Sequence, residues 1–264
     1  MTMITLVLIL MSLVSGSAFA AQPELVTFPS RKLTLSGFIY KPKGVGPFPA
    51  VLYNHGSERK PGWKPELGEL FSEKGYVFFV PHRRGHGRSP DDSRIDSLYS
   101  QGVRGEVALH EIHLEDQLAA LSYLKGLPYV DTNRIAVAGC SYGGIQTILA
   151  VEANAEMNLG LKGAVDFAGA AMTWARAPNM RNRLLSAVRK ATIPILFVQA
   201  ENDYDLGPSR ALAKELERLG TPHKVAIFPP YGRTAADGHG GFCFEGGDVW
   251  GAEVLSFLAS AMSR

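Results

Sequence analysis

A serine between two glycines lies in residues 134–144, where the sequence reads as a strand, a sharp turn and the start of a helix. The turn spells Gly139-Cys140-Ser141-Tyr142-Gly143. A serine in such a turn projects from the sheet and can attack a carbonyl carbon, while the flanking glycines leave room for the tight backbone. The positive end of the following helix stabilises negative charge beside it. We therefore predict that Ser141 is a nucleophile; an ordinary strand-to-helix turn is the alternative.

A serine hydroxyl becomes an effective nucleophile only when a histidine takes its proton and a carboxylate orients that histidine. Three acids, Glu201, Asp203 and Asp205, follow the apolar run of residues 195–199 at the carboxyl end of a predicted strand. The chain order serine, acid, histidine favours an acid at this point. We predict that Asp203 is the orienting acid, with Asp205 and Glu201 as the alternatives. The alternative without a catalytic role is that Asp203 only forms a turn.

The expected base lies near the end of the chain. His239 belongs to the glycine-rich residues 237–241, which follow the last predicted strand and precede the final predicted helix. We expect a loop with a flexible backbone there, and this is where the order of the three residues places the histidine. His239 is therefore the predicted base, and an ordinary loop histidine is the alternative.

Two backbone N–H groups are needed to stabilise the oxyanion that forms when a serine attacks a carbonyl. One is expected from Tyr142, directly after the nucleophile. The other is expected from Gly56 or Ser57, in the loop after the buried strand of residues 50–53. A loop glycine without this role is the alternative for Gly56.

The elements that would position these residues alternate between strands and helices along most of the chain. The predicted strands are residues 25–28, 33–40, 50–53, 76–80, 134–138, 163–167, 193–199 and 224–228, and the predicted helices are residues 63–74, 106–125, 145 onward, 179–190, 209–219 and 249–262. This alternation predicts an α/β fold with a mostly parallel, doubly wound sheet flanked by helices. Residues 90–105 are expected to be irregular, and residues 168–192 are too few for a large cap domain.

Composition limits the classes of partner. The chain has 264 residues, of which 46% are hydrophobic, and it carries a net charge of +2. This length suits one sizeable core. Both signs of charge are interspersed without a basic stripe, so no nucleic-acid partner is predicted. The charge balance does not indicate the substrate, and the sequence does not indicate the oligomeric state.

The first residues predict an exported protein. An apolar run over residues 4–14 is too short to span a bilayer and is followed by the small residues 15–20, which end in Ala18-Phe19-Ala20. This pattern is typical of a signal peptide. We predict cleavage after Ala20, a single domain over residues 21–264, a secreted or periplasmic location and no stable membrane anchor. A buried or frayed N-terminal segment is the alternative.

The two cysteines flank the predicted site. Cys140 adjoins Ser141, and Cys243 follows His239 by four residues. If the site forms as predicted, the two sulfur atoms lie near each other. A chain of this size folds without a covalent link, so we expect two small buried hydrophobic residues, with a disulfide as the alternative.

Metal-binding residue types occur in two other groups. His82 and His86 are close in sequence, and His110, His113 and Asp116 have helical spacing. Neither group completes a recognised zinc pattern. We therefore predict no metal and no cofactor.

Two further sets of side chains are candidates for substrate contacts. They are the arginines Arg83, Arg84 and Arg88 and the aromatic residues Trp63, Trp174 and Tyr231. The arginines suit a substrate carboxylate, although pairing with nearby acids is the commoner outcome. The aromatic residues suit an acyl or alcohol pocket, and core packing is the alternative.

Taken together, the motifs from about residue 25 to the end resemble an α/β-hydrolase of the dienelactone hydrolase and prolyl-oligopeptidase-like groups. The motifs are His55-Gly56, Arg84-Gly85-His86-Gly87-Arg88-Ser89, residues 131–144, Asp203 and His239. The resemblance implies carboxylic-ester hydrolysis through an acyl-enzyme, with Ser141, Asp203 and His239 as the triad and no metal or cofactor.

Two differences from these groups narrow the predicted function. Dienelactone hydrolases carry cysteine at the centre of the turn, where this chain has Ser141. Prolyl-oligopeptidase relatives carry a large propeller that is absent from this sequence. A serine carboxylesterase acting on small to medium esters is therefore the predicted function. A peptidase or amidase on the same triad, a non-catalytic binding protein of this fold, and a thioesterase or acyltransferase are the alternatives.

Overall fold

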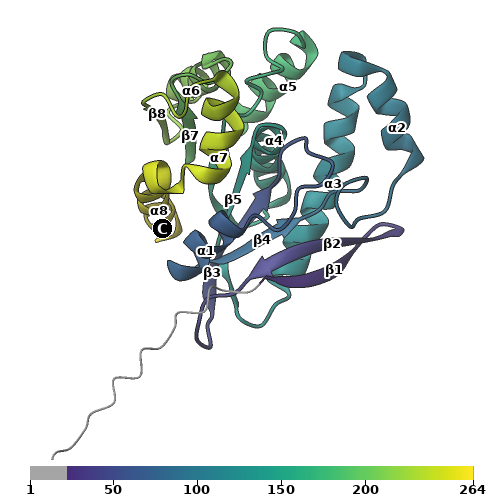
Figure 1. The fold of residues 1–264 in the computed structure, drawn as a ribbon, viewed down its shortest axis with the longest axis vertical. Coiled ribbons are helices and arrows are strands. Elements are labelled where there is room, and N and C mark those ends of the chain that lie inside the picture. Colours follow the sequence, from purple (N-terminus) through teal and green to yellow (C-terminus); the bar gives the residue numbers. More distant parts are fainter. Residues whose placement is uncertain (1–22, 264) are drawn as a thin grey trace, which may run out of the picture.

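The computed structural model describes residues 23–263, which form an eight-stranded sheet covered by helices on both faces (Figure 1). The strands are β1 (Glu24–Ser30), β2 (Leu33–Tyr40), β3 (Phe48–Asn54), β4 (Val77–Pro81), β5 (Val130–Cys140), β6 (Leu161–Phe167), β7 (Ile195–Ala200) and β8 (His223–Phe228). The main helices are α1 (Pro65–Glu73), α2 (Ser93–Ser100), α3 (Glu106–Lys125), α4 (Tyr142–Met157), α5 (Pro178–Val188), α6 (Gly207–Leu219), α7 (Phe242–Glu245) and α8 (Gly247–Met262).

The sheet order is β1-β2-β4-β3-β5-β6-β7-β8. The first two strands form an antiparallel hairpin at one edge, and β2 also runs antiparallel to β4. From β4 to β8 all neighbours are parallel. Parallel strands end at the same edge of a sheet, so the loops that follow β3, β5 and β7 meet there. The predicted α/β-hydrolase fold is confirmed.

Two apolar clusters fill the space between the sheet and the helices. Side chains alternate across the sheet, so Ala50 and Leu52 of β3 join one cluster, while Val51 and Tyr53 join the other. The first cluster packs against α3, α4, α5 and α6, and the second against α1 and α8. Figure 1 shows α7 and α8, in yellow, on the opposite side of the molecule from α2 and α3.

The structure corrects the expectation for residues 90–105, which contain the helix α2 and a short 3-10 turn, Gly102–Arg104. Asp92 accepts a hydrogen bond from the N–H of Arg94 and so caps the start of α2. Ile95 is the one buried residue of α2. With one buried apolar residue, α2 has no repeating apolar pattern in its sequence, and for this reason the helix was not predicted.

The predicted signal peptide, residues 1–20, lies outside the described residues. Within residues 23–263, the helices are all too short or too polar to cross a membrane.

Candidate active site

Ser141 lies at the junction between β5 and α4, in a backbone conformation with φ 57° and ψ −114°. A positive φ is unusual for a residue with a side chain and marks a constrained turn. The neighbouring glycines are required by close backbone contacts: a Cβ on Gly139 would lie 2.3 Å from the Gly143 oxygen, and a Cβ on Gly143 would lie 1.9 Å from the Asn54 oxygen. The turn after β5 is therefore pressed against the end of β3.

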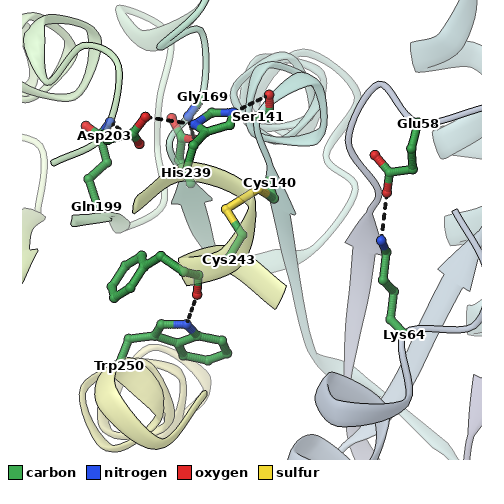
Figure 2. Close-up of a disulfide and its surroundings, with 12 residues drawn as sticks. Glu58, Lys64, Cys140, Ser141, Gly169, Gln199, Asp203, His239, Cys243 and Trp250 are labelled. Carbon is green, nitrogen blue, oxygen red and sulfur yellow. Dashed lines mark hydrogen bonds and ion pairs between the residues drawn. A yellow bond between two sulfur atoms is a disulfide. The ribbon is translucent and has the colours of Figure 1, made fainter. Parts of the chain in front are cut away.

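The three residues of the predicted triad meet at the carboxyl edge of the sheet (Figure 2). Nε2 of His239 lies 2.8 Å from Oγ of Ser141, and Nδ1 of His239 lies 2.8 Å from Oδ1 of Asp203. Both distances are in hydrogen-bond range. Asp203 and His239 are buried, so the hydrogen bond between them is largely shielded from water. The arrangement can pass a proton from the serine to the histidine.

Asp203 is held in place by its own strand and loop. Its Oδ2 accepts a hydrogen bond from Nε2 of Gln199 (2.9 Å), and its Oδ1 accepts one from the N–H of Tyr204 (2.6 Å). The alternative acids point elsewhere: Oδ1 of Asp205 accepts from the N–H of Gly207, and Glu201 is exposed. The role of Gln199 was not visible in the sequence, because Gln199 reads only as the end of an apolar strand.

The segment that carries His239 is helical, which corrects the expectation of a flexible loop. Residues Asp237–Gly241 form a π-helical turn that leads directly into α7. Asn202, from the same loop as Asp203, donates to the oxygens of Tyr231 and Thr234 (2.9 Å each). These contacts join the loop after β7 to the segment after β8, so the acid and the base are held by one hydrogen-bonded unit.

Cys140 and Cys243 form a disulfide, which corrects the expectation of two separate buried thiols (Figure 2). The disulfide connects the last residue of β5, next to Ser141, to α7, which follows the turn of His239. It spans a sequence separation of 103 residues. The segments that carry Ser141 and His239 are therefore linked by a disulfide as well as by the hydrogen bond between these two side chains.

The residues predicted to supply the oxyanion hole lie on two adjoining segments. Tyr142 is the first residue of α4, whose N-terminus receives no side-chain cap. Gly56 and Ser57 follow β3. A Cβ on Gly56 would lie 3.7 Å from the Cys140 oxygen, so this loop lies against the turn of Ser141. Beyond it, Glu58 pairs with Lys64 (2.7 Å), as Figure 2 shows.

A second buried carboxyl lies on the strand between the nucleophile and the acid. Asp166, near the end of β6, is fully buried and accepts a hydrogen bond from the N–H of Gly169 (2.7 Å). Burial raises the pKa of Asp166 to about 7, and the charge of Asp203 adds to the rise. The mechanism suggested by the triad makes no use of this group.

The histidines proposed as possible metal ligands have other contacts. Among residues 23–263, no group of three or more histidine, cysteine or acidic side chains is arranged to hold a metal ion. Nδ1 of His113 lies 2.7 Å from the Tyr142 hydroxyl, and Nδ1 of His110 lies 2.9 Å from the Gln146 amide. Asp116 instead binds the buried guanidinium of Arg84 (2.6 Å).

The other candidates for substrate contacts lie in different environments, some buried and some at the surface. Arg84 is buried on Asp116 and Arg88 is exposed, while Arg83 is buried on backbone oxygens. Trp174 packs against the core. Trp63 and Tyr231 line neighbouring surface hollows that both include Phe244, just beyond the turn of His239.

Comparison with known proteins places this chain in a family. A model of the prolyl oligopeptidase family matches residues 67–261, and the chain belongs to this family. The chain is also similar to a putative carboxymethylenebutenolidase and, in fold, to a putative dienelactone hydrolase.

The relatives include probable dipeptidyl-aminopeptidases and a putative carboxymethylenebutenolidase. A probable dipeptidyl-aminopeptidase B of Grosmannia clavigera is 36% identical over 81 residues, which are 31% of this chain and 8% of that protein. A putative carboxymethylenebutenolidase of Synechocystis is 23% identical over 225 residues, covering 83% of this chain and 86% of that protein. The chain thus spans under a tenth of the first relative and most of the second.

Solved structures show the same fold at low identity. An acylaminoacyl peptidase from Pyrococcus horikoshii aligns with a TM-score of 0.64 and 22% identity, over 83% of this chain and 38% of that one. A putative dienelactone hydrolase from Klebsiella pneumoniae aligns with a TM-score of 0.69 and 17% identity, over 91% of this chain and 99% of that one. At these identities the alignments establish the fold alone.

Proposed function

We propose that this protein is a serine carboxylesterase that hydrolyses small to medium carboxylic esters through an acyl-enzyme. The observation that carries the proposal is the pair of 2.8 Å contacts linking Ser141 to His239 and His239 to Asp203. Serine, histidine and acid in this arrangement are the parts needed to attack a carbonyl carbon.

In the first half of the proposed reaction, Nε2 of His239 takes the proton of Ser141 while Oγ attacks the ester carbonyl. Asp203 holds the imidazole in the correct tautomer and stabilises its positive form. The tetrahedral oxyanion is bound by the N–H of Tyr142 and an N–H of Gly56 or Ser57. His239 then donates its proton to the leaving alcohol, and the acyl group remains on Ser141.

In the second half, His239 takes a proton from water, and the resulting hydroxide attacks the acyl-enzyme. The same oxyanion site stabilises the second tetrahedral intermediate. His239 returns the proton to Oγ of Ser141, and the carboxylic acid leaves. The chain's own residues account for every proton transfer in this scheme.

The support for ester substrates is the likeness to a putative dienelactone hydrolase and a putative carboxymethylenebutenolidase, because both names refer to lactones, which are cyclic esters. The chain aligns along nearly the whole of the putative dienelactone hydrolase structure and most of the carboxymethylenebutenolidase relative. It covers only 38% of the acylaminoacyl peptidase.

The test is hydrolysis of p-nitrophenyl esters from acetate to palmitate by the purified protein. We expect turnover of the short and medium esters, and we expect Ser141→Ala to lower kcat about 10⁵-fold or more, because triad members act as a unit. Ser100→Ala, the same change at an exposed serine of α2, is the matched control and should leave kcat unchanged. Turnover retained in Ser141→Ala would exclude the mechanism.

A peptidase or amidase is the second candidate, because several relatives are peptidases. Comparing a p-nitroanilide with the p-nitrophenyl ester of the same acyl group separates the two functions. A preference for the anilide would favour the peptidase. If the folded protein turned over neither substrate and a fluorophosphonate did not label Ser141, a non-catalytic binding role would be favoured.

We also propose that the chain is exported and begins at Ala21 after processing. The disulfide between Cys140 and Cys243 supports this location, since such bonds persist mainly in oxidising compartments. N-terminal sequencing of the protein from the periplasm or medium of an expressing bacterium tests the proposal. Full-length protein that stays in the cytoplasm would contradict it.

A further inference from the structure

Arg83 is a buried cation whose contacts differ from those of its neighbour Arg84. Both side chains are almost fully buried. Arg84 pairs with Asp116 (2.6 Å) and Asp92 (3.2 Å). For Arg83, no carboxylate in the described part of the chain lies within ion-pair distance, and burial lowers its pKa. Burying an unpaired charge is costly, so its retention at the edge of an active site calls for a functional explanation.

The guanidinium of Arg83 instead holds two successive peptide groups after β3. Its Nη1 donates to the His55 oxygen (2.8 Å) and its Nη2 to the Gly56 oxygen (2.6 Å). The His55 ring supports the same arrangement, with Nδ1 lying 2.9 Å from the Gly56 oxygen. Burial and the Arg83 charge hold the pKa of His55 well below its usual range, so this ring stays neutral.

These contacts set the direction of the two N–H groups in the same peptides. In a trans peptide the C=O and the following N–H point in opposite directions. With the oxygens of His55 and Gly56 turned toward Arg83, the N–H groups of Gly56 and Ser57 are turned away from it. These are the two N–H groups that we assign as alternatives for the oxyanion hole.

Arg83 also contacts the segment that supplies the other donor. Its guanidinium carbon lies 4.5 Å from the centre of the Tyr142 ring. The same ring is fixed from its hydroxyl by His113 (2.7 Å) and is stacked on His110 (3.7 Å between ring centres). One guanidinium therefore contacts both segments that would form the oxyanion hole.

We infer that Arg83 is the positioning residue of the oxyanion hole, an inference that rests on the proposed function. The two hydrogen bonds from its Nη1 and Nη2 hold the loop of Gly56 and Ser57 against the start of α4. Its positive charge lies behind these peptides and favours negative charge on their opposite side. Arg83 touches neither substrate nor the reacting atoms.

The test compares Arg83→Met, Arg83→Lys and the matched control Arg84→Lys on p-nitrophenyl acetate. Arg83→Met keeps the apolar stem but removes the charge and the donors, so kcat should fall roughly 10²-fold with KM changed less than about 3-fold. Arg83→Lys should recover part of this loss. Arg84→Lys should lower the urea midpoint of unfolding but leave kcat near that of the wild type.

Affinity for an alkyl boronic acid separates positioning from general damage, because its tetrahedral adduct occupies the oxyanion hole. If Arg83 positions the hole, the inhibition constant rises by about the same factor as kcat/KM falls. If Arg83→Met does not fold, Arg83→Lys serves for both measurements. Wild-type kcat in a folded Arg83 variant, or lost kcat with unchanged boronate affinity, would overturn the inference. Activity retained by Ser141→Ala would instead overturn the proposed function.

Discussion

Asp203 and Asp205 follow the same strand, but only Asp203 reaches His239. We expect Asp203→Asn to lower kcat about 10³- to 10⁴-fold, because an amide favours the wrong tautomer of the imidazole. Asp205→Asn should keep kcat close to the wild-type value, since an amide oxygen can still accept the hydrogen bond from Gly207. Steady-state kinetics on one ester checks both. Equal losses in the two variants would mean that the acid has been assigned wrongly.

The buried carboxyl of Asp166 should make the stability of the fold depend on pH. Its pKa is about 7 in the folded chain, so the folded state keeps a proton that the unfolded chain loses near pH 4. The stabilisation is complete below pH 4 and is lost as the pH rises to 7. We expect Asp166→Asn to become more stable relative to the wild type by roughly 2–4 kcal/mol between pH 4 and pH 8.

Urea unfolding of the wild type and Asp166→Asn at several pH values measures this difference. Comparing the two proteins at each pH cancels the contributions of other groups, such as Asp92, whose pKa is lowered to about 2. A difference that does not change with pH would show that Asp166 is ionised throughout this range.

At the scale of elements, the junction of β5 and α4 has no space for another atom at Gly143. A Cβ there would lie 1.9 Å from the backbone oxygen of Asn54, which cannot move without displacing β3. We expect Gly143→Ala to lower the free energy of unfolding by more than about 4 kcal/mol. Denaturant unfolding followed by circular dichroism measures the change.

Gly251→Ala is the matched control for this variant. Gly251 lies within α8, and an added Cβ would be 3.6 Å from the nearest side-chain atom, an ordinary contact. Alanine favours a helix over glycine, so this change should raise stability by about 0.5–1 kcal/mol. A tolerated Gly143→Ala would mean that the turn of Ser141 can move away from β3.

At the scale of the whole molecule, the disulfide joins the centre of the sheet to the C-terminal helices. The segment that it closes, with a sequence separation of 103 between the cysteines, includes α4, β6, α5, β7, α6 and β8. We expect a reducing agent to lower the free energy of unfolding by about 2–5 kcal/mol, chiefly because the reduced unfolded chain is less constrained. Urea unfolding with and without dithiothreitol checks this expectation.

The variant with Cys140→Ala and Cys243→Ala is the control for the disulfide. It should unfold at the same urea concentration with and without the reducing agent. Both cysteines are buried, so the native wild type should also keep its activity in reductant without urea. An unchanged wild-type midpoint on reduction would show that the disulfide adds no stability.

The sequence by itself determined the features that depend on neighbouring residues. Helix α3 was predicted with both ends correct, because its apolar spacing and the glycines beside it are local signals. The glycines beside Ser141 and the order of the candidate residues along the chain predicted Ser141 and His239, and they favoured Asp203 while leaving Asp205 and Glu201 as alternatives. The turn of Ser141 is a local signal, and the order of the three residues could be read from the alternation of strands and helices along the chain.

Only the tertiary structure decided the contacts between distant residues. It selected Asp203 over Asp205, joined Cys140 to Cys243, and placed His239 on a helical turn in place of the expected loop. It also directed Arg83 to the backbone oxygens after β3, where the sequence had suggested a substrate or an acid. Such contacts depend on which atoms the packed sheet and helices bring together, and that is not encoded in any short stretch of the chain.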